Sequence, residues 1–397
     1  MDEAATRATK VIRLAGAPPH LAEDAITEIL LRLPAKSVIR FRAVSTAWRR
    51  IATDPHFLAA HARLRPADVL FYTYLEPRRI RHARSSVVEM IALDTLPVSS
   101  DDASQRRRLI SYSSKYPRKR GSCLLLSSCN GVLLFKDDKG SYILCNPVTR
   151  QWAELPWLAH GNRGTGFREY AFYFHQPSSE YRLWCKRDWF ISGTWDVLCT
   201  GATEPRQVDF HGEAVRTITD LVVTTPVDLH GRLHWPPHRA PGTDKMEIVM
   251  LETLSEMFRT MAGPPISTTT RPINLFDMEG QLVVADLGEM YCINLWFLED
   301  YDAGRWECRH RVATPWQNQW NLLRVVMMGD GEGNIILGHQ NCLLKHDKRS
   351  KTLSMVNSVD TPQHNVKLSR HVFRENLVQH PYFHTRSSND LRLIHLW

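Results

Sequence analysis

The chain has 397 residues and a mass of 45.7 kDa, which is too long for one ordinary single-core domain and predicts about two or three domains. Hydrophobic residues make up 43% and charged residues 23% of the sequence, a balance typical of a packed globular protein rather than a disordered one. Lys and Arg (50) outnumber Asp and Glu (42), for a formal net charge of +8.

The sequence contains no apolar run that approaches the ~18 residues of a membrane-spanning helix. Its first residues, including Asp2 and Glu3, lack the apolar segment of a signal peptide. Eight cysteines occur, no two separated by two residues, and most lie in apolar, strand-like runs. They predict reduced, buried thiols in an intracellular protein, cytoplasmic, nuclear or both, rather than a disulfide framework. Paired zinc ligands at short spacing are missing, and we expect no metal and no cofactor.

Residues 1–17 are expected to be a disordered N-terminal segment, and a helical domain is expected over 18–64. Pro34 ends the first helix, because the residue before a proline is biased away from the helical region. Apolar residues recur at i, i+3, i+4 and i+7 in that helix, which places Ile26, Ile29, Leu30 and Leu33 on one stripe.

A second helical segment follows Ala35 and is expected to crowd Val38, Ile39, Phe41 and Val44 on one side. Ser45 is a plausible N-cap for a third helix that carries Ala47, Trp48, Ile51 and Ala52. The pair Asp54-Pro55 predicts a cap and first-turn proline for one more short helix. So small a unit buries too little of its own surface to be stable in isolation and is expected to need a partner.

This segment resembles an F-box. The resemblance covers about forty residues with fixed internal spacing, from Leu21-Ala22-Glu23-Asp24 through Glu28-Ile29-Leu30-Leu31-Arg32-Leu33-Pro34 and Phe41-Arg42-Ala43-Val44-Ser45 to Asp54-Pro55-His56-Phe57. It implies a three-helix F-box module that docks on a Skp-family adaptor, which links it to a cullin-based ubiquitin ligase. By the same resemblance, the adaptor contacts fall on Leu21, Ala22, Ile26, Ile29, Leu30, Leu33, Pro34, Val44 and Trp48.

The alternative interpretation is that these residues are the core of a small helical bundle, and several of them are expected to serve both roles. One position departs from the family pattern, because Ala22 stands where the family usually has proline. Proline would present a flat apolar ring and a pre-organised backbone, so we expect the alanine to weaken adaptor binding somewhat.

Residues 76–120 carry eleven Lys or Arg against five acidic residues, most of the net positive charge of the chain. Such a block can contact nucleic acid, but aromatic residues are few here and no nucleic-acid-binding fold surrounds it. The stretch around 99–120 is expected to be a solvated, mobile loop, whereas Val69–Tyr74 and Val87–Leu93 are strand-like. We therefore expect a β domain to start near residue 66 and to extend to about 385, followed by a tail over 386–397.

Beyond residue 120, short apolar runs follow a repeated scheme of a polar residue, a glycine and a strand, as tight hairpins require. The glycines of this scheme are spaced by about 50 residues if one repeat lacks its marker. Aromatic residues are expected to end each repeat as core between blades, at Trp152, Trp195, Phe258 and Trp306. This period predicts an irregular β-propeller of about six blades, so that the fold class is multidomain α plus all-β.

Two further segments resemble the F-box-associated domain of large plant F-box families. They are Ser127–Pro156, with its Cys-Asn-Gly and Cys-Asn-Pro-Val-Thr-Arg runs, and Ile293–Trp306. The resemblance implies a propeller that binds a target protein. Trp316 and Trp320, inside a polar stretch, are hypothesised to contact that target on a propeller loop.

Catalytic motifs are missing: the sequence has no nucleophile elbow, zinc-protease helix or phosphate-binding loop. With the two resemblances in order, the sequence predicts a non-catalytic substrate-recognition subunit of a Skp–cullin–F-box ubiquitin ligase. Its expected partners are the adaptor, through it a cullin, and an unknown target protein; membrane contact is not expected and nucleic acid is disfavoured. The alternatives are a propeller scaffold that binds a glycan or small ligand, and an F-box protein that acts outside a ligase.

Overall fold

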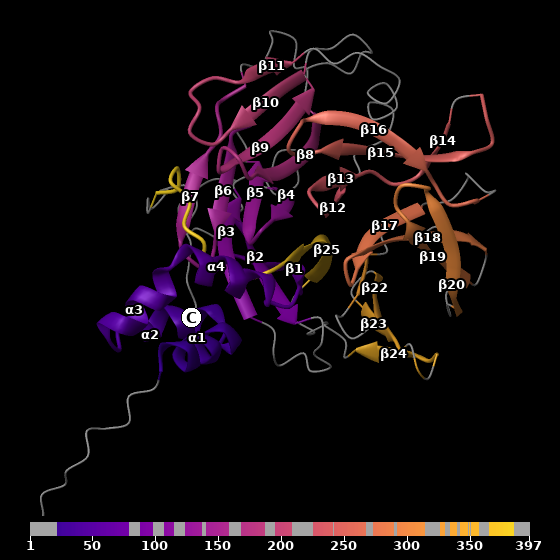
Figure 1. Cartoon of the computed structure of the whole chain (residues 1–397). Coiled ribbons are helices and arrows are strands. Elements are labelled where there is room, and N and C mark those ends of the chain that lie inside the picture. Colours follow the sequence, from indigo (N-terminus) through magenta and orange to yellow (C-terminus); the bar gives the residue numbers. More distant parts are fainter. Residues whose placement is uncertain are drawn as a thin grey trace, which may run out of the picture. The chain divides into compact units, whose positions relative to one another are not determined.

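The protein divides into two compact units, residues 1–64 and 65–397. We describe it from a computed structural model of the whole chain (Figure 1). The structure describes residues 22–78, 88–97, 107–114, 124–136, 140–158, 168–186, 195–208, 225–240, 242–266, 273–289, 292–313, 326–329, 334–339, 342–347, 349, 351–356 and 365–384. Within these ranges no helix is long and apolar enough to cross a membrane.

The described residues of the first unit form four helices: the three that the resemblance implies and the short helix predicted at Pro55, which continues for nine residues. Both predicted caps are present: the Ser45 hydroxyl accepts a hydrogen bond from the Trp48 amide, and the Asp54 carboxylate accepts from the amides of His56 and Phe57. The helices are α1 (Glu23–Arg32), α2 (Ala35–Phe41), α3 (Thr46–Thr53) and α4 (Pro55–Arg63).

The core of the helical unit comes from one apolar face of each helix. Leu30 and Val38 are fully buried, and the buried His61 ring of α4 lies 2.9 Å from the Leu33 carbonyl oxygen at the end of α1. This contact ties the last helix to the first. The other buried apolar side chains are Ile26, Ala35, Ile51, Ala52, Phe57 and Leu58.

The described residues of the second unit form a β-propeller of six antiparallel sheets, which confirms the predicted class and the predicted number of about six blades. We name the sheets blades A to F in chain order. Blade B is made of consecutive strands from the inside outward, and blade C repeats the arrangement. Their strands are β4 (Leu124–Cys129), β5 (Val132–Lys136), β6 (Tyr142–Asn146), β7 (Gln151–Glu154), β8 (Arg168–His175), β9 (Glu180–Lys186), β10 (Trp195–Cys199) and β11 (Arg206–Val208).

Blades D, E and F follow the same plan, except that blade D contains an extra short strand, β14, beside β15. Their strands are β12 (Val227–Leu229), β13 (Arg232–His234), β14 (His238–Arg239), β15 (Met246–Glu252), β16 (Met257–Ala262), β17 (Ile273–Met278), β18 (Gln281–Glu289), β19 (Cys292–Asp300), β20 (Arg305–Ala313), β21 (Val326–Gly329), β22 (Ile335–His339), β23 (Cys342–His346) and β24 (Leu353–Val356).

Blade A joins the two ends of the propeller sequence. Its inner strand is the C-terminal β25 (Asn365–Phe373), which pairs with β1 (Asp68–Arg78), as Figure 1 shows. The blade continues outward through β2 (Val88–Pro97) and β3 (Arg107–Ser114). Because β25 also contacts β4 and β21, the inner strands of the first, second and last blades meet, and the ring closes.

The expected basic loop around 99–120 contains a strand, β3. Two arginines at its start form ion pairs: Arg107 bonds Asp68 at 2.9 Å and Glu375 at 3.1 Å, and Arg108 bonds Asp94 at 3.0 Å. A run of charged residues can therefore lie on the edge of a sheet when acidic side chains lie beside it.

Three tight turns join inner strands to their neighbours at predicted polar-glycine pairs. Asn130-Gly131, His230-Gly231 and Glu279-Gly280 all have positive φ at both residues, as a twisted two-residue hairpin requires. Blade C is the repeat that lacks the marker, since its equivalent turn ends at Ser179 with φ 53.

Most of the predicted aromatic residues are buried between blades. Trp306 lies in a cluster with Met246 and Met261, which joins blades D and E, and Trp195 and Phe258 lie in a cluster that joins blades C and D. Trp195 was expected to end its repeat, but it begins β10, the third strand of blade C. The short last strand of the blade, β11, has no aromatic residue, so the aromatic residue of this repeat lies one strand earlier than expected.

Candidate functional site

The helical unit carries several large apolar side chains that are exposed. Of the eight large hydrophobic side chains that are exposed among the described residues, four lie here, with exposed fractions of 41% for Ile29, 36% for Ile39, 60% for Val44 and 58% for Leu64. Because exposed large apolar side chains are typical of protein–protein contacts, this unit carries the first candidate site.

The predicted adaptor residues separate into surface and core. Ile29 and Val44 are largely exposed, Ala22 and Pro34 are exposed, and Leu33 and Trp48 are half-buried. By contrast, Ile26 and Leu30 are buried inside the helical unit, with 7% and 0% exposure, so Leu30 offers no surface to a partner. Leu21 lies outside the described residues.

The second helix does not have the one-sided arrangement expected from its sequence. Val38 is fully buried while its neighbour Ile39 is exposed, because adjacent residues on a helix point about 100° apart. The sequence pattern therefore did not identify Ile39 as a surface residue. It did not identify Leu64, at the end of α4, either. The signal that could have identified Ile39 is its position next to Val38, which already occupies the core side of a short helix.

The exposed surface is held in place by bonds around the α2–α3 turn. Arg42 donates from Nε and Nη2 to the Ala52 carbonyl oxygen at 3.2 and 2.9 Å, and Arg49 donates to the Arg42 carbonyl oxygen. Phe41 and Trp48 stack edge to face with ring centroids 5.0 Å apart. These contacts give the turn that carries Val44 a defined shape before any partner binds.

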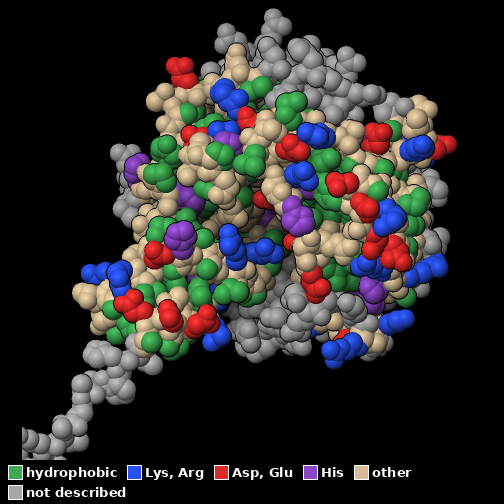
Figure 2. Space-filling view, viewed as in Figure 1, with side chains coloured by type: hydrophobic (Ala, Val, Ile, Leu, Met, Phe, Trp, Pro, Cys, Tyr) green, Lys and Arg blue, Asp and Glu red, His purple; other side chains and the backbone are tan. Residues whose placement is uncertain are grey.

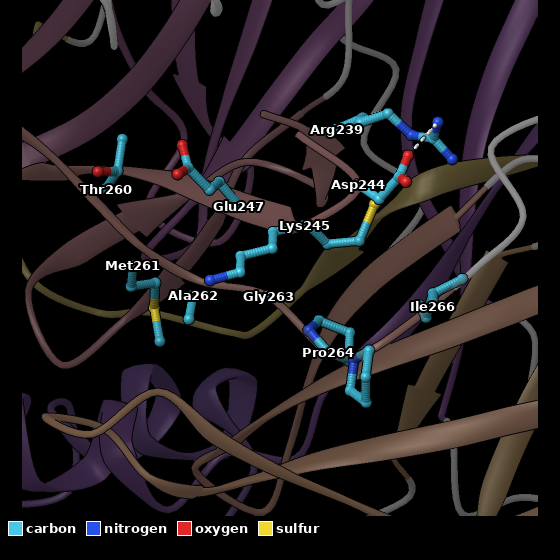
Figure 3. A pocket seen from close by; sticks show the side chains of 12 residues that line it. Arg239, Asp244, Lys245, Glu247, Thr260, Met261, Ala262, Gly263, Pro264 and Ile266 are labelled. Atoms are coloured by element: carbon cyan, nitrogen blue, oxygen red, sulfur yellow. Dashed lines mark hydrogen bonds and ion pairs between the residues drawn. The ribbon is translucent and has the colours of Figure 1, made fainter. Parts of the chain in front are cut away.

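In the propeller unit, a hollow of about 700 Å³ opens at one end of blade D (Figure 3). The hairpin that leads into β15 bounds one side, and the chain after β16 bounds the other. Met246, Met261 and Ile266, which are almost fully buried, line its base, and Pro264 and Pro265 line it too. Methionine side chains adapt to different apolar partners, so this base suits more than one ligand shape.

Charged side chains surround the hollow in equal numbers of each sign. Arg239 bonds Asp244 at 2.9 Å across the hairpin. Lys245 and Glu247 have no ion-pair partner among the described side chains. Figure 2 likewise shows basic and acidic groups interspersed over the visible face rather than gathered by sign. The hollow therefore offers apolar contact with local charge pairing, but no net charge that would attract a strongly charged ligand.

The hollow lies at the end of the strands opposite to tight turns such as Glu279-Gly280. The strands β11 and β20 end at the hollow's end of their blades, and β12 and β21 begin there. In sequence, residues 209–226 separate β11 from β12, and residues 314–325 separate β20 from β21. Trp316 and Trp320, predicted to contact a target, belong to the second connection and lie outside the described residues.

The described cysteines are free thiols. Cys129, Cys145, Cys185 and Cys199 are buried, and burial raises the pKa of each of these thiols, so they are not poised as nucleophiles. Within the described ranges no group of three or more His, Cys, Asp or Glu side chains is placed to hold a metal ion.

Comparison with known proteins gives the same division of the chain. The family model described as "F-box domain" matches residues 19–59, and the one described as "F-box associated beta propeller domain" matches residues 89–380. Among curated proteins of Arabidopsis thaliana, the chain is similar to putative F-box protein At3g10240, 31% identical over 73% of this chain and 71% of that protein. It is also similar to F-box protein CPR1, 21% identical over 85% of this chain and 84% of that protein.

Proposed function

The chain belongs to the plant F-box proteins that carry an F-box associated β-propeller domain, and on that premise we propose that it is the substrate-recognition subunit of a Skp–cullin–F-box ubiquitin ligase. The helical unit would bind a Skp-family adaptor, and the propeller would bind a target protein. The observation that carries the proposal is the exposed apolar surface of the helical unit, which coincides with the F-box match.

The adaptor-binding surface is assigned to the exposed members of the predicted set. Ile29 on α1 and Val44 in the α2–α3 turn provide most of its large apolar area, and Ala22, Leu33, Pro34 and Trp48 contribute the remainder. Covering such side chains with a partner removes apolar area from water, which contributes about 25 cal/mol per Å². Ile26 and Leu30 support the surface from within.

The target-binding surface is assigned to the end of the propeller that carries the hollow in blade D. Two features support this choice: the strands on either side of the long sequence segments 209–226 and 314–325 end and begin there, and binding residues are found disproportionately on loops held by a rigid scaffold. Met246 and Met261 at the base would receive an apolar side chain of the target, while Lys245 and Glu247 would contact polar groups beside it.

Such a subunit would contribute to ubiquitin transfer by proximity rather than by chemistry. Holding a target near the ubiquitin carrier raises the effective concentration of its lysines, to the order of millimolar for short flexible linkages. The buried thiols, whose pKa values burial raises, are unsuited to acyl transfer, and we assign no reacting group to this chain.

Two experiments test the proposal. The full chain, mixed with a purified Skp-family adaptor, is expected to co-elute with it on gel filtration. Proteins captured by the full chain under proteasome inhibition are expected to be ubiquitylated when adaptor, cullin and ubiquitin-charging enzymes are added. Co-elution without ubiquitylation of any captured protein would instead favour an F-box protein that acts outside a ligase. Absence of co-elution would contradict the proposal.

A further inference from the structure

The chain after β25 crosses the turn end of blades B and C, opposite the end that carries the hollow. We call this segment, Arg374–His384, the C-terminal strap. Its first half is anchored to blade B: the Asn376 side chain donates to the Asn130 carbonyl oxygen at 2.6 Å, and the Asn146 side chain donates to the Asn376 carbonyl oxygen at 3.0 Å. Leu377 is fully buried. This half is part of the fold.

The second half of the strap, His380–His384, packs on a surface formed by Phe174, Tyr181 and Trp152, which we call the groove. The His380 Nε2 is 3.1 Å from the Tyr181 hydroxyl, and its ring centroid is 5.2 Å from that of Phe174. Phe383 packs into the apolar cluster shared by blades B and C, with its ring centroid 5.8 Å from that of Tyr181. The groove therefore holds two rings that are three residues apart in sequence.

The backbone of this half adds to the edge of a sheet. His384 donates to the Trp152 carbonyl oxygen at 2.7 Å and accepts from the Trp152 amide at 2.9 Å, an antiparallel bridge on β7. Since β7 is the outermost strand of blade B, its edge is available for strand addition, which is a common way for a sheet to bind an extended peptide.

The two halves of the strap differ in how they are attached. Gln379, which joins the two halves, is exposed, and so is Pro381 within the second half. Tyr382 is 37% exposed, and its ring covers Gly201. His380–His384 is attached by three ring side chains, one side-chain hydrogen bond and one backbone bridge. These are the contacts of a bound peptide.

We propose that the groove over blades B and C is a peptide-binding site, that His380–His384 is its resident occupant, and that an extended peptide from another protein, with an imidazole followed three residues later by a phenyl ring, exchanges with it. This proposal goes beyond target binding at the hollow and is independent of adaptor binding. Burial lowers the pKa of His380 to about 4, so the ring is held neutral at pH 7, as it would be in an exchanging peptide.

The test uses the full chain with a loosened strap and a fluorescein-labelled peptide that has the sequence of residues 380–384. The variant His380→Ala/Phe383→Ala is expected to bind this peptide at least about tenfold more tightly than the wild-type chain, because a tethered occupant competes at an effective concentration in the millimolar range. The peptide with alanine in place of its phenylalanine is expected not to bind. As the control, Gln379→Ala changes an exposed side chain and is expected to behave as wild type.

A cooperatively folded double variant that binds the peptide no more tightly than wild type would overturn the proposal. Should the double variant fail to fold, hydrogen exchange of the wild-type chain decides. The amides of Trp152 and His384 are expected to exchange at least about tenfold faster than that of Leu144 in β6, since the strap opens without the blade. Equal protection of all three would show that His380–His384 leaves its groove only when the propeller unfolds, and would overturn the proposal.

Discussion

The Glu256 carboxylate, in the turn between β15 and β16 of blade D, accepts a hydrogen bond at 2.5 Å from the Tyr173 hydroxyl on β8 of blade C. The same carboxylate accepts from Arg182 at 2.7 Å and from Arg206. Burial alone would raise the pKa of Glu256, but these three donors outweigh it and lower the pKa below its usual value. One side chain thus joins two blades at a half-buried position.

We expect Glu256→Ala to destabilise the propeller by about 2 to 4 kcal/mol, because it removes the acceptor that Tyr173, Arg182 and Arg206 share and leaves Arg182 only its bonds to Glu180 and Ser178. Glu279→Ala is the matched control: both glutamates have φ 55, but Glu279 is exposed in its turn. The strain of alanine at positive φ therefore cancels between the variants. Urea unfolding of both variants measures the difference, and equal losses would show that the network contributes nothing.

Ring closure by the C-terminal strand depends on a glycine in blade B. A Cβ on Gly131 would lie 2.5 Å from the Asn376 Cβ and 2.6 Å from the Arg374 carbonyl oxygen, whereas a Cβ on Gly280, which also has positive φ, would meet nothing within 4 Å. Gly131→Ala should therefore cost at least about 2 kcal/mol more than Gly280→Ala, as both carry the same conformational penalty. The comparison is made by thermal unfolding, and similar midpoints would argue against the close approach.

Two buried histidines make the propeller sensitive to acid. Burial lowers the pKa of His234, beside the Tyr301 hydroxyl at 2.6 Å, and of His380 to about 4 each, below the unfolded value near 6.5. Between these values the unfolded chain binds more protons, so these histidines make the unfolding free energy rise with pH over that window. Each contributes up to about 3 kcal/mol above pH 6.5, which is lost as the pH falls toward 4.

Asp68 acts in the opposite direction, because burial raises its pKa to about 6 and its ionisation disfavours the fold as the pH rises over that range. The histidine effect is therefore measured as a difference between variants. His234→Gln/His380→Gln is expected to reduce the rise in unfolding free energy from pH 4 to 6.5, while the exposed His230→Gln leaves it unchanged. Identical pH profiles for all three chains would refute the assignment.

The residue at which this F-box departs from its family pattern can accept the usual proline. Ala22 is the N-cap of α1, with φ −58, which is within the range that a proline ring fixes. We expect Ala22→Pro to stabilise the helical unit by about 0.4 to 1 kcal/mol by restricting the unfolded chain. Tighter adaptor binding is expected as well, because the exposed ring adds apolar area. Calorimetry of the variant checks both effects, and weaker adaptor binding would contradict the second.

Much of this architecture could be predicted because its signals are local. The caps at Ser45 and Asp54 and the turns at Asn130-Gly131 and Glu279-Gly280 depend on residues adjacent in sequence. Closure of blade A could not be predicted, since β25 and β1 pair across almost the whole length of the propeller. Nor could periodicity divide the helical stripe into surface and core: Ile29 and Leu30 belong to one apolar run, and only the packing of α3 and α4 against α1 buries the second and leaves the first exposed.

The central claim, that the exposed apolar surface of the helical unit binds a Skp-family adaptor, is tested most directly by calorimetric titration of the full chain with that adaptor. The wild-type chain is expected to bind, and Ile29→Asp/Val44→Asp to bind at least about tenfold more weakly, a loss of 1.4 kcal/mol or more. Leu254→Asp, which charges an equally exposed leucine of the propeller, should bind as wild type. Binding by the double variant that equals wild type, or no binding by the wild-type chain, would contradict the claim.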